Sequence, residues 1–267
     1  MNPHLTVRLA VANDYPRYAA LFPELGVDDP IPSEEVFTSR LLPTTIVTER
    51  DGAVVGYAYF QRLNDTVYVR NVVTDPGHRR RGVGRVLMQE LERRARAAGA
   101  TRWCLNVKPE NVAARALYEE FGMTVAYAAV ALRFAWEVVE KLPADPAETR
   151  SLEPAEDATV EARFELPRGL IEDARQRPRH HVIGVYSGTD ALGVACFSPG
   201  FPGAFPFRVA RVGLARPLLE ACRALALPEL NYMQVVVEDD AALAATLIEH
   251  GAGVRTEIVH YRGELVA

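Results

Sequence analysis

The sequence feature that most restricts the fold is the run of residues 72–88, in which two glycines separate a predicted strand from a predicted helix. Residues 66–70 alternate and include β-branched side chains, which is typical of a strand, and apolar residues recur at helical spacing from Val86 onward. Because Gly82 and Gly84 have no Cβ, an anion can approach the backbone N–H groups at the positive end of the helix. The run therefore predicts a strand, a glycine-rich turn that binds phosphate or pyrophosphate, and a helix.

Three arginines, Arg79, Arg80 and Arg81, precede these glycines and add positive charge that can pair with phosphate oxygens. The run lacks the Gly-x-x-x-x-Gly-Lys pattern of a P-loop. It also lacks a Gly-x-Gly-x-x-Gly pattern that follows a strand and precedes an acidic residue by about twenty positions. Neither nucleotide hydrolysis nor dinucleotide binding is therefore expected.

Residues 79–84 (RRRGVG) resemble the coenzyme A signature of the GNAT superfamily of acetyltransferases, Gln/Arg-x-x-Gly-x-Gly/Ala. Upstream, residues 70–76 (RNVVTDP) look like the fourth strand of that family running into its loop. Downstream, residues 111–123 (NVAARALYEEFGM) are similar to its second motif, in which an Asn opens a helix that carries a Tyr. The resemblance implies an acetyl-CoA-dependent N-acetyltransferase that uses no metal.

The resemblance also implies which residues do the chemistry. A backbone N–H at Val73 would polarise the thioester carbonyl, and Tyr118 would act as general acid toward the coenzyme A sulfur. A phenol with a reference pKa of about 10 stays protonated at neutral pH and can give its proton to a thiolate. The alternative for Tyr118 is a core aromatic residue at helical spacing. The implied coenzyme A site consists of Val72, Val73, Arg79, Arg80, Arg81, Gly82, Val83, Gly84, Arg85, Asn111, Ala114 and Tyr118.

The general base is not evident, because Arg70 lies near the position at which many GNAT enzymes have a Glu. One interpretation is that the proton leaves through ordered water and groups such as Tyr57 or Tyr59. Another is that Arg70 recognises a carboxylate or phosphate on the acceptor. A third is that Arg70 points to the opposite face of its strand, since alternate strand residues do. The predicted catalytic set is Tyr118, Val73 and Arg70.

Composition limits the class of partner. With 267 residues, 49% of them hydrophobic, the chain can bury the core of one large or two modest domains. The net charge of −5 gives no global basic field, so nucleic acid is not expected as a partner. We see no secretory signal or membrane-spanning run, and the three cysteines lack metal-ligand spacing, so we expect reduced thiols in a cytoplasmic protein without a membrane partner.

The two halves of the chain contain a degenerate internal repeat. The second copy lacks the residues that carry the chemistry, because Arg211 stands where the first copy has Gly82, and Leu247 replaces Tyr118. The stretch 198–207, rich in Pro and Gly, predicts no regular central strand. The matched segments are residues 9–14 with 152–157, residues 46–60 with 183–197, and, without gaps, residues 79–133 with 208–262.

The predicted fold is therefore α/β with two GNAT-like domains, each a mixed, mostly antiparallel sheet flanked by helices, and with splayed parallel central strands in the first. We expect a catalytic domain over residues 1–142, a linker over 143–149 and a non-catalytic GNAT-like domain over 150–267. The expected acceptor is a primary amine of a small molecule, such as an amino acid or an antibiotic-like compound. Acetylation of peptides or proteins, transfer of a longer acyl group, and an acetyl-CoA-binding sensor or scaffold without turnover are alternatives. Monomer and homodimer both stay open.

Overall fold

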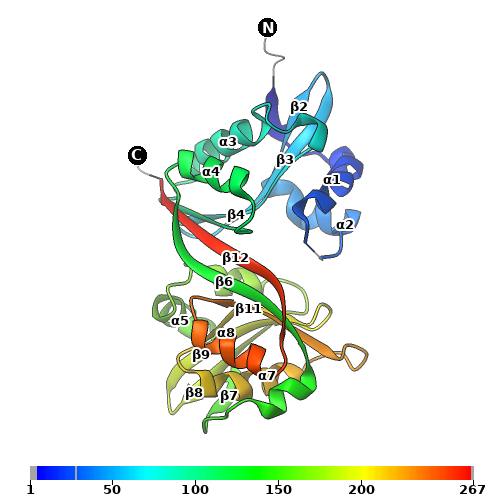
Figure 1. The fold of residues 1–267 in the computed structure, drawn as a ribbon. Coiled ribbons are helices and arrows are strands. Elements are labelled where there is room, and N and C mark those ends of the chain that lie inside the picture. Colours follow the sequence, from blue (N-terminus) through cyan, green and yellow to red (C-terminus); the bar gives the residue numbers. More distant parts are fainter. Residues whose placement is uncertain (1–4, 28, 266–267) are drawn as a thin grey trace. The chain divides into compact units, whose positions relative to one another are not determined.

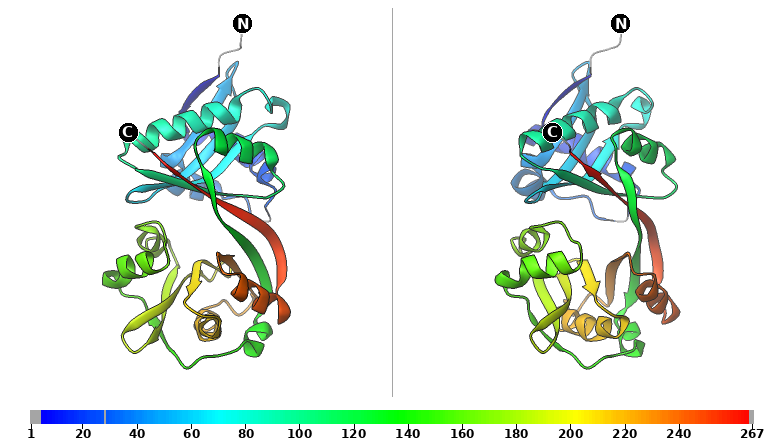
Figure 2. Two further views of the ribbon diagram at one scale, coloured as in Figure 1. Left: turned by 60° about the vertical axis from the view of Figure 1, so that its left-hand side comes forward. Right: turned by 90° about the vertical axis from the view of Figure 1, so that its left-hand side faces the viewer.

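The computed structural model describes residues 5–27 and 29–265 and divides into two compact units (Figures 1 and 2). The first unit comprises Met1–Val107, Asn111–Val125 and Tyr261–Ala267, and the second comprises Lys108–Glu110 and Ala126–His260. Each unit is a mixed sheet with helices packed on it, so the α/β fold predicted from the sequence is confirmed.

The first unit has a sheet in which β1 to β4 pair antiparallel in chain order and β5 pairs parallel with β4. Helix α3 is amphipathic and buries one stripe, Val83, Leu87, Met88, Leu91 and Ala95. Figure 1 shows α3 and α4 on one side of this sheet and α1 and α2 on the other. The elements are β1 (Thr6–Leu9), α1 (Tyr15–Leu21), α2 (Glu34–Val36), β2 (Thr45–Arg50), β3 (Ala53–Arg62), β4 (Thr66–Thr74), α3 (Val83–Ala97), β5 (Arg102–Val107) and α4 (Val112–Glu120).

The second unit repeats this order. Strands β7, β8, β9 and β10 pair antiparallel in sequence, and β11 pairs parallel with β10. Its elements are β6 (Thr124–Ala135), β7 (Glu148–Ser151), α5 (Asp157–Arg163), α6 (Leu170–Arg175), β8 (His181–Ser187), β9 (Asp190–Ser198), β10 (Gly203–Val209), α7 (Ala215–Arg223), β11 (Tyr232–Glu238), α8 (Ala241–Glu249) and β12 (Gly253–Glu264). Strands β6 and β12 each contribute residues to both units.

The compact units do not end at the boundary expected near residue 142. Strand β6 follows the first copy's α4, yet its residues Ala129–Ala135 pair with β11 of the second unit. Strand β12 follows the second copy's α8, yet it is the neighbour of β5, and from Tyr261 onward it belongs to the first unit. The two strands correspond in the repeat, at an offset of 129 residues (253 − 124). The two copies have therefore exchanged equivalent strands, which hydrophobic patterning cannot reveal because the pattern of a strand does not say which sheet it joins.

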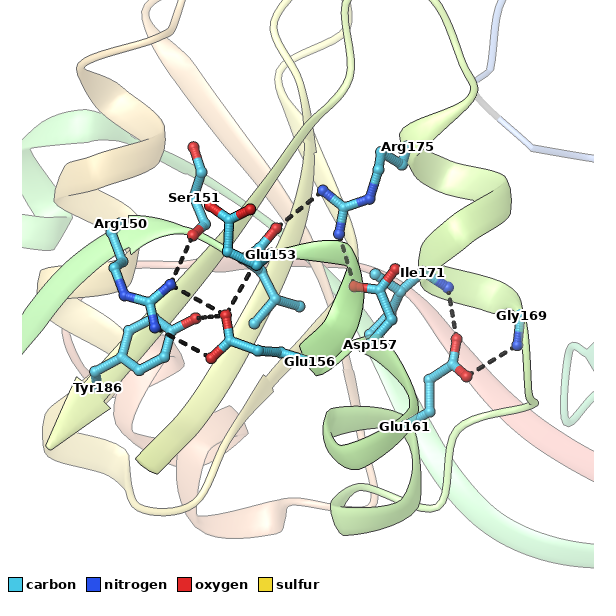
Figure 3. Close-up of polar contacts among 11 residues, drawn as sticks. Arg150, Ser151, Glu153, Glu156, Asp157, Glu161, Gly169, Ile171, Arg175 and Tyr186 are labelled. Atoms are coloured by element: carbon cyan, nitrogen blue, oxygen red, sulfur yellow. Dashed lines mark hydrogen bonds and ion pairs between the residues drawn. The ribbon is translucent and has the colours of Figure 1, made fainter. Parts of the chain in front are cut away.

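Equivalent ion pairs in the two units support the repeat independently of sequence identity. In the first unit Arg8 Nη1 lies 2.6 Å from the Asp14 carboxylate. In the second, Arg150 Nη1 lies 3.0 Å from the Glu156 carboxylate, which also accepts a hydrogen bond from the Tyr186 hydroxyl (Figure 3). Strand pairing matches these pairs, because Leu9 lies opposite Ile46 and Ser151 lies opposite Ile183. The alignment of Leu9 with Leu152 is therefore wrong by one residue.

The stretch 198–207 does contain a strand, contrary to the prediction from its Pro and Gly content. β10 starts at Gly203, with a register shift between Ala204 and Phe207 where it pairs with β9. Pro206 is tolerated there because a bulge leaves backbone groups out of the ladder. A bulge also interrupts β4 at Arg70, so the two copies share this irregularity.

Candidate functional site

The loop that joins β4 to α3, residues 75–84, has the geometry of an anion site; we call it the phosphate loop. Gly82 is the N-cap of α3 with φ +85°, and its carbonyl accepts the first helical hydrogen bond, from Val86 N, at 3.0 Å. No side chain among the described residues caps this helix. Because the first N–H groups of a helix have no acceptor within it, they are directed at any anion placed there.

The two glycines of the loop are needed for different reasons. A Cβ on Gly82 would have no heavy atom within 4 Å, so the space in front of it is open, but its positive φ disfavours any side chain. A Cβ on Gly84 would lie 3.1 Å from Leu117 Cδ2, so Gly84 lets α3 approach α4 closely. The missing Cβ of Gly82 therefore leaves room for a ligand, whereas the missing Cβ of Gly84 leaves room for α4 to pack against α3.

An anchor at the start of the loop was not predicted from the sequence. The Asp75 carboxylate accepts hydrogen bonds from Gly77 N at 2.8 Å, from His78 Nδ1 at 3.0 Å and from the Arg17 guanidinium. The hydrogen bonds from His78 and Arg17 lower the pKa of the Asp75 carboxyl. His78 thus helps to fix the loop through Asp75. Only an Asp followed by Pro, the start of a turn, could have indicated this anchor.

The predicted arginines divide into two groups. Arg79 pairs with Glu24 and Arg85 pairs with Glu120, each at 2.6 Å. Arg80 and Arg81 are exposed, and neither forms an ion pair with a described residue. Arg80 also has φ +62°, a conformation that turns consecutive N–H groups toward one side. The free arginines and the loop backbone together suit a doubly charged pyrophosphate.

The splayed strands predicted for the first unit are present. Strand β4 pairs with β5 only from Thr66 opposite Arg102 to Val69 opposite Leu105, although β4 continues to Thr74. Beyond Val69, the edge of β4 that faces β5 has no strand partner. An extended ligand arm can form hydrogen bonds with such an edge as a peptide does when it adds to a sheet.

The pairing register of β3 and β4 shows which way the backbone N–H of Val73 points. Asp75 N donates to Val55 O, and Val73 lies opposite Tyr57 two residues earlier. Because the N–H groups of an antiparallel strand alternate in direction, the N–H of Val73 faces β3. The N–H groups of Val72 and Thr74 face the open edge instead. Val72, and not Val73, is therefore placed to donate a hydrogen bond to a ligand in the splay.

The Arg70 side chain lies on the same face of the sheet as Gln61. Its Nε and Nη2 donate to Gln61 Oε1 at 2.9 and 2.7 Å, and its guanidinium lies 3.7 Å from the centroid of the Tyr68 ring. Arg70 is the bulged residue, since Tyr59 lies opposite Asn71 and the next pair is Phe60 with Val69. A guanidinium held by stacking and two hydrogen bonds has a fixed direction.

Helix α4 carries the remaining predicted residues. Asn111 caps it, because its Oδ1 accepts from Ala114 N at 3.2 Å. Tyr118 lies about two helical turns after the cap. Its side chain is buried, and this burial raises the pKa of its phenol to about 12. The Tyr118 ring meets the ring of Tyr261 edge to face, with centroids 6.2 Å apart. Tyr261 belongs to β12 and was not predicted as a site residue.

The second unit lacks the phosphate loop. β4 and α3 are separated by Asp75–Gly82, whereas β10 and α7 are separated only by Ala210–Leu214, none of which has a positive φ. The gap-free alignment of residue 79 with residue 208 is therefore wrong. Arg208 lies opposite Val194, as Val73 lies opposite Tyr57, so strand register matches it with Val73.

Where the first unit has an open splay, a side-chain bridge crosses the second. Arg208 Nη2 lies 2.9 Å from Glu238 Oε2, and the Tyr127 hydroxyl donates to Glu238 Oε1 at 3.1 Å. Arg208 is on β10 and Glu238 is on β11, each beyond the last pair of those strands, Ala204 with Val235. A buried ion pair of this kind is costly to break, so the diverging strands are tied together.

A polar cluster around α5 and α6 of the second unit contains three carboxylates, those of Glu156, Asp157 and Glu161 (Figure 3). Arg175 pairs with Asp157 at 2.6 Å, and the buried Glu161 accepts from Gly169 N and Ile171 N, both at 2.9 Å. These carboxylates of α5 bond to both ends of α6 and so tie the two helices together. The cluster therefore stabilises the second unit.

Comparisons with known proteins give a matching family model for the first unit and a matching fold for the chain. Residues 13–123 match the model of the acetyltransferase (GNAT) family. The chain has the fold of a tandem GNAT protein from the clavulanic acid biosynthesis pathway, with a TM-score of 0.62, 21% identity and 99% of each chain covered.

Curated relatives match only part of the chain. It is 32% identical over 77 residues to the ribosomal protein bS18 alanine N-acetyltransferase of Escherichia coli, covering 29% of this chain and 52% of that protein. It is 37% identical over 78 residues to the L-2,4-diaminobutyric acid acetyltransferase of Nocardia farcinica, covering 28% and 40%. The chain thus spans about half the length, or less, of these relatives. None of the described helices is long and apolar enough to cross a membrane.

Proposed function

We propose that the first unit binds acetyl-CoA and transfers its acetyl group to the primary amine of a small molecule. The observation that carries this proposal is the phosphate loop next to the open strand edge of β4. The phosphate loop would hold the pyrophosphate, and the edge of β4 would hold the pantetheine arm. Two relatives are named as acetyltransferases of an alanine of ribosomal protein bS18 and of L-2,4-diaminobutyric acid, which supports an amine acceptor.

The reaction requires a neutral amine, a hydrogen-bond donor for the thioester oxygen and a proton for the leaving sulfur. The nitrogen lone pair forms a bond to the carbonyl carbon while the carbonyl oxygen gains negative charge. The backbone N–H of Val72 would donate to that oxygen. When the C–S bond breaks, the Tyr118 phenol would give its proton to the thiolate, the amine would lose one proton to water, and solvent would reprotonate the phenolate. The products are the amide and the free thiol of coenzyme A.

For Tyr118, burial supports the role of an acid. A phenol whose pKa is raised to about 12 is protonated at any pH at which the protein works. It therefore keeps the proton that the thiolate needs and does not compete with the amine as a nucleophile.

We propose that the second unit does not bind acetyl-CoA. Its loop is five residues long (Ala210–Leu214) and has no positive φ, and Arg208 and Glu238 bridge its diverging strands. Its contribution to the reaction is then structural.

An acceptor assay tests the proposed function. Release of coenzyme A thiol from acetyl-CoA is expected in the presence of diaminobutyrate, other amino acids or peptides that begin with alanine, and not with the same compounds N-acetylated in advance. Turnover by small amines supports the proposal, and turnover by peptides alone favours the protein N-acetyltransferase alternative. Binding of acetyl-CoA without turnover of any amine would favour a sensor.

Arg70 is proposed to bind a carboxylate or phosphate of the acceptor. Replacing Arg70 with Ala is expected to raise the KM for the acceptor about tenfold or more and to leave the KM for acetyl-CoA within about twofold, because a charge-assisted hydrogen bond contributes roughly 1.5–3 kcal/mol. Steady-state kinetics with each substrate varied in turn measures both constants. The exposed Arg62, at the end of β3, provides the control Arg62→Ala. An unchanged acceptor KM in Arg70→Ala would exclude this role.

A further inference from the structure

We propose that Tyr261, which belongs to the second copy of the repeat, is a positioning residue for the general acid Tyr118 of the first unit. The inference rests on the proposed function. It assigns to the second half of the chain a part in the reaction, because β12 is the strand that follows the second copy's last helix, α8.

Tyr261 is fixed on three sides within the first unit. Its side chain is fully buried, and its hydroxyl donates to Glu119 Oε1 at 2.8 Å and accepts from Arg115 Nε at 3.1 Å. Arg115, Tyr118 and Glu119 are spaced by three and four residues, so they lie on one face of α4. Tyr261 therefore contacts three residues of α4: the ring of Tyr118 itself, Arg115 before it and Glu119 after it.

The edge-to-face contact determines where the Tyr118 phenol points. With centroids 6.2 Å apart and planes inclined by 62°, the Tyr261 ring occupies the space into which the Tyr118 side chain could otherwise turn. The Tyr261 ring contributes to the burial that raises the pKa of the Tyr118 phenol. Leu132 of β6 corresponds to Tyr261 in the repeat, so only the exchanged strand brings an aromatic ring to α4.

The backbone of β12 holds Tyr261 in register with the first unit. A Cβ on Gly263 would lie 2.5 Å from Trp103 Nε1, so the strand approaches β5 more closely than any other residue would allow. Leu265 N donates to Thr101 O at 2.7 Å just before β5. The strand is thus anchored two and four residues beyond Tyr261, and the tyrosine cannot shift without losing both contacts.

The test compares Tyr261→Leu, which copies the first repeat, with Tyr261→Phe, which removes only the hydroxyl. Protein labelled at tyrosine Cζ with carbon-13 is titrated between about pH 8 and pH 11, and the Tyr118 resonance is assigned by its loss in Tyr118→Phe. In the wild type this resonance should not titrate over that range. In Tyr261→Leu it should titrate with a midpoint lowered toward 10, and in Tyr261→Phe it should behave as in the wild type. Tyr232→Leu, a change of the same kind on β11, is the control and should leave it unaltered.

Kinetics give a second readout with the acceptor found above. Tyr261→Leu is expected to lower kcat about tenfold with the KM for acetyl-CoA within about twofold, and to cause no further loss when Tyr118 is already Phe. An equal loss in both backgrounds, or a Tyr118 resonance that does not change in Tyr261→Leu, would overturn the proposal. If no amine is acetylated, the proposed function fails, while the resonance still decides whether Tyr261 positions Tyr118.

Discussion

Gly82→Arg is expected to abolish binding of acetyl-CoA to this protein. Gly82 has φ +85°, and nothing lies within 4 Å of the position that its Cβ would take. An arginine there is strained by roughly 1–2 kcal/mol, and its long side chain fills the space in front of the α3 N–H groups. Both effects act on the pyrophosphate subsite. Calorimetric titration of acetyl-CoA should give one site per wild-type chain and no measurable heat of binding for the variant.

The matched control is Gly99→Arg at the other end of α3. Gly99 has φ +77° and is also open to space, so the same residue brings the same backbone strain without approaching the phosphate loop. This variant should bind one equivalent with nearly wild-type affinity. Residual binding by Gly82→Arg would mean that the second unit binds coenzyme A or that the phosphate loop is not the site. Two equivalents bound by the wild type would contradict the assignment of the second unit as non-binding.

Tyr118→Phe is expected to lower kcat by about 100-fold or more and to leave the dissociation constant of acetyl-CoA within about threefold. The phenylalanine fills the same buried space and keeps the contact with the Tyr261 ring, so α4 should remain folded. Only the proton for the leaving thiolate is lost, and general acid catalysis typically contributes 10²–10⁴-fold. Steady-state release of coenzyme A thiol, together with calorimetry, separates the two quantities.

The raised pKa of Tyr118 also predicts how kcat changes with pH. Because the pKa of Tyr118 is raised to about 12, the phenol stays protonated up to about pH 11. The wild-type kcat should therefore rise with pH as the acceptor amine loses its proton and should not fall again below about pH 11 through loss of the acid. A fall near pH 10 would indicate a phenol with an ordinary pKa, and a kcat unaffected by Tyr118→Phe would assign Tyr118 to the core.

The local sequence was sufficient to predict those parts of the candidate site that depend on local backbone conformation. Gly82 and Gly84 predicted the phosphate loop because only glycine suits a positive φ and a close helix contact. Asn111 predicted the cap of α4, because its side-chain oxygen reaches an N–H three residues later. Each of these features depends on neighbours in the chain.

The direction in which an N–H group or a side chain of a strand points could not be predicted from the local sequence in the same way. Whether Val72 or Val73 offers its N–H to the splay depends on which residue of β3 lies opposite, and a shift of one residue reverses the answer. The bulge at Arg70 placed that side chain beside Gln61 and over Tyr68, which pattern alone could not choose. Likewise, the missing loop of the second unit was hidden, because a gap-free alignment assigned Arg208 to the loop when it lies in a strand.

The sequence by itself determined that this chain has two copies of one α/β fold and that the first retains a phosphate loop, because glycines, caps and alternation act over a few residues. Only the tertiary structure decided that the copies exchange β6 and β12 and that Tyr261 reaches Tyr118 across 143 positions (261 − 118). The pattern of a strand predicts which of its faces is buried but not which sheet it joins, so the partners of β6 and β12 follow from the packing of the whole chain.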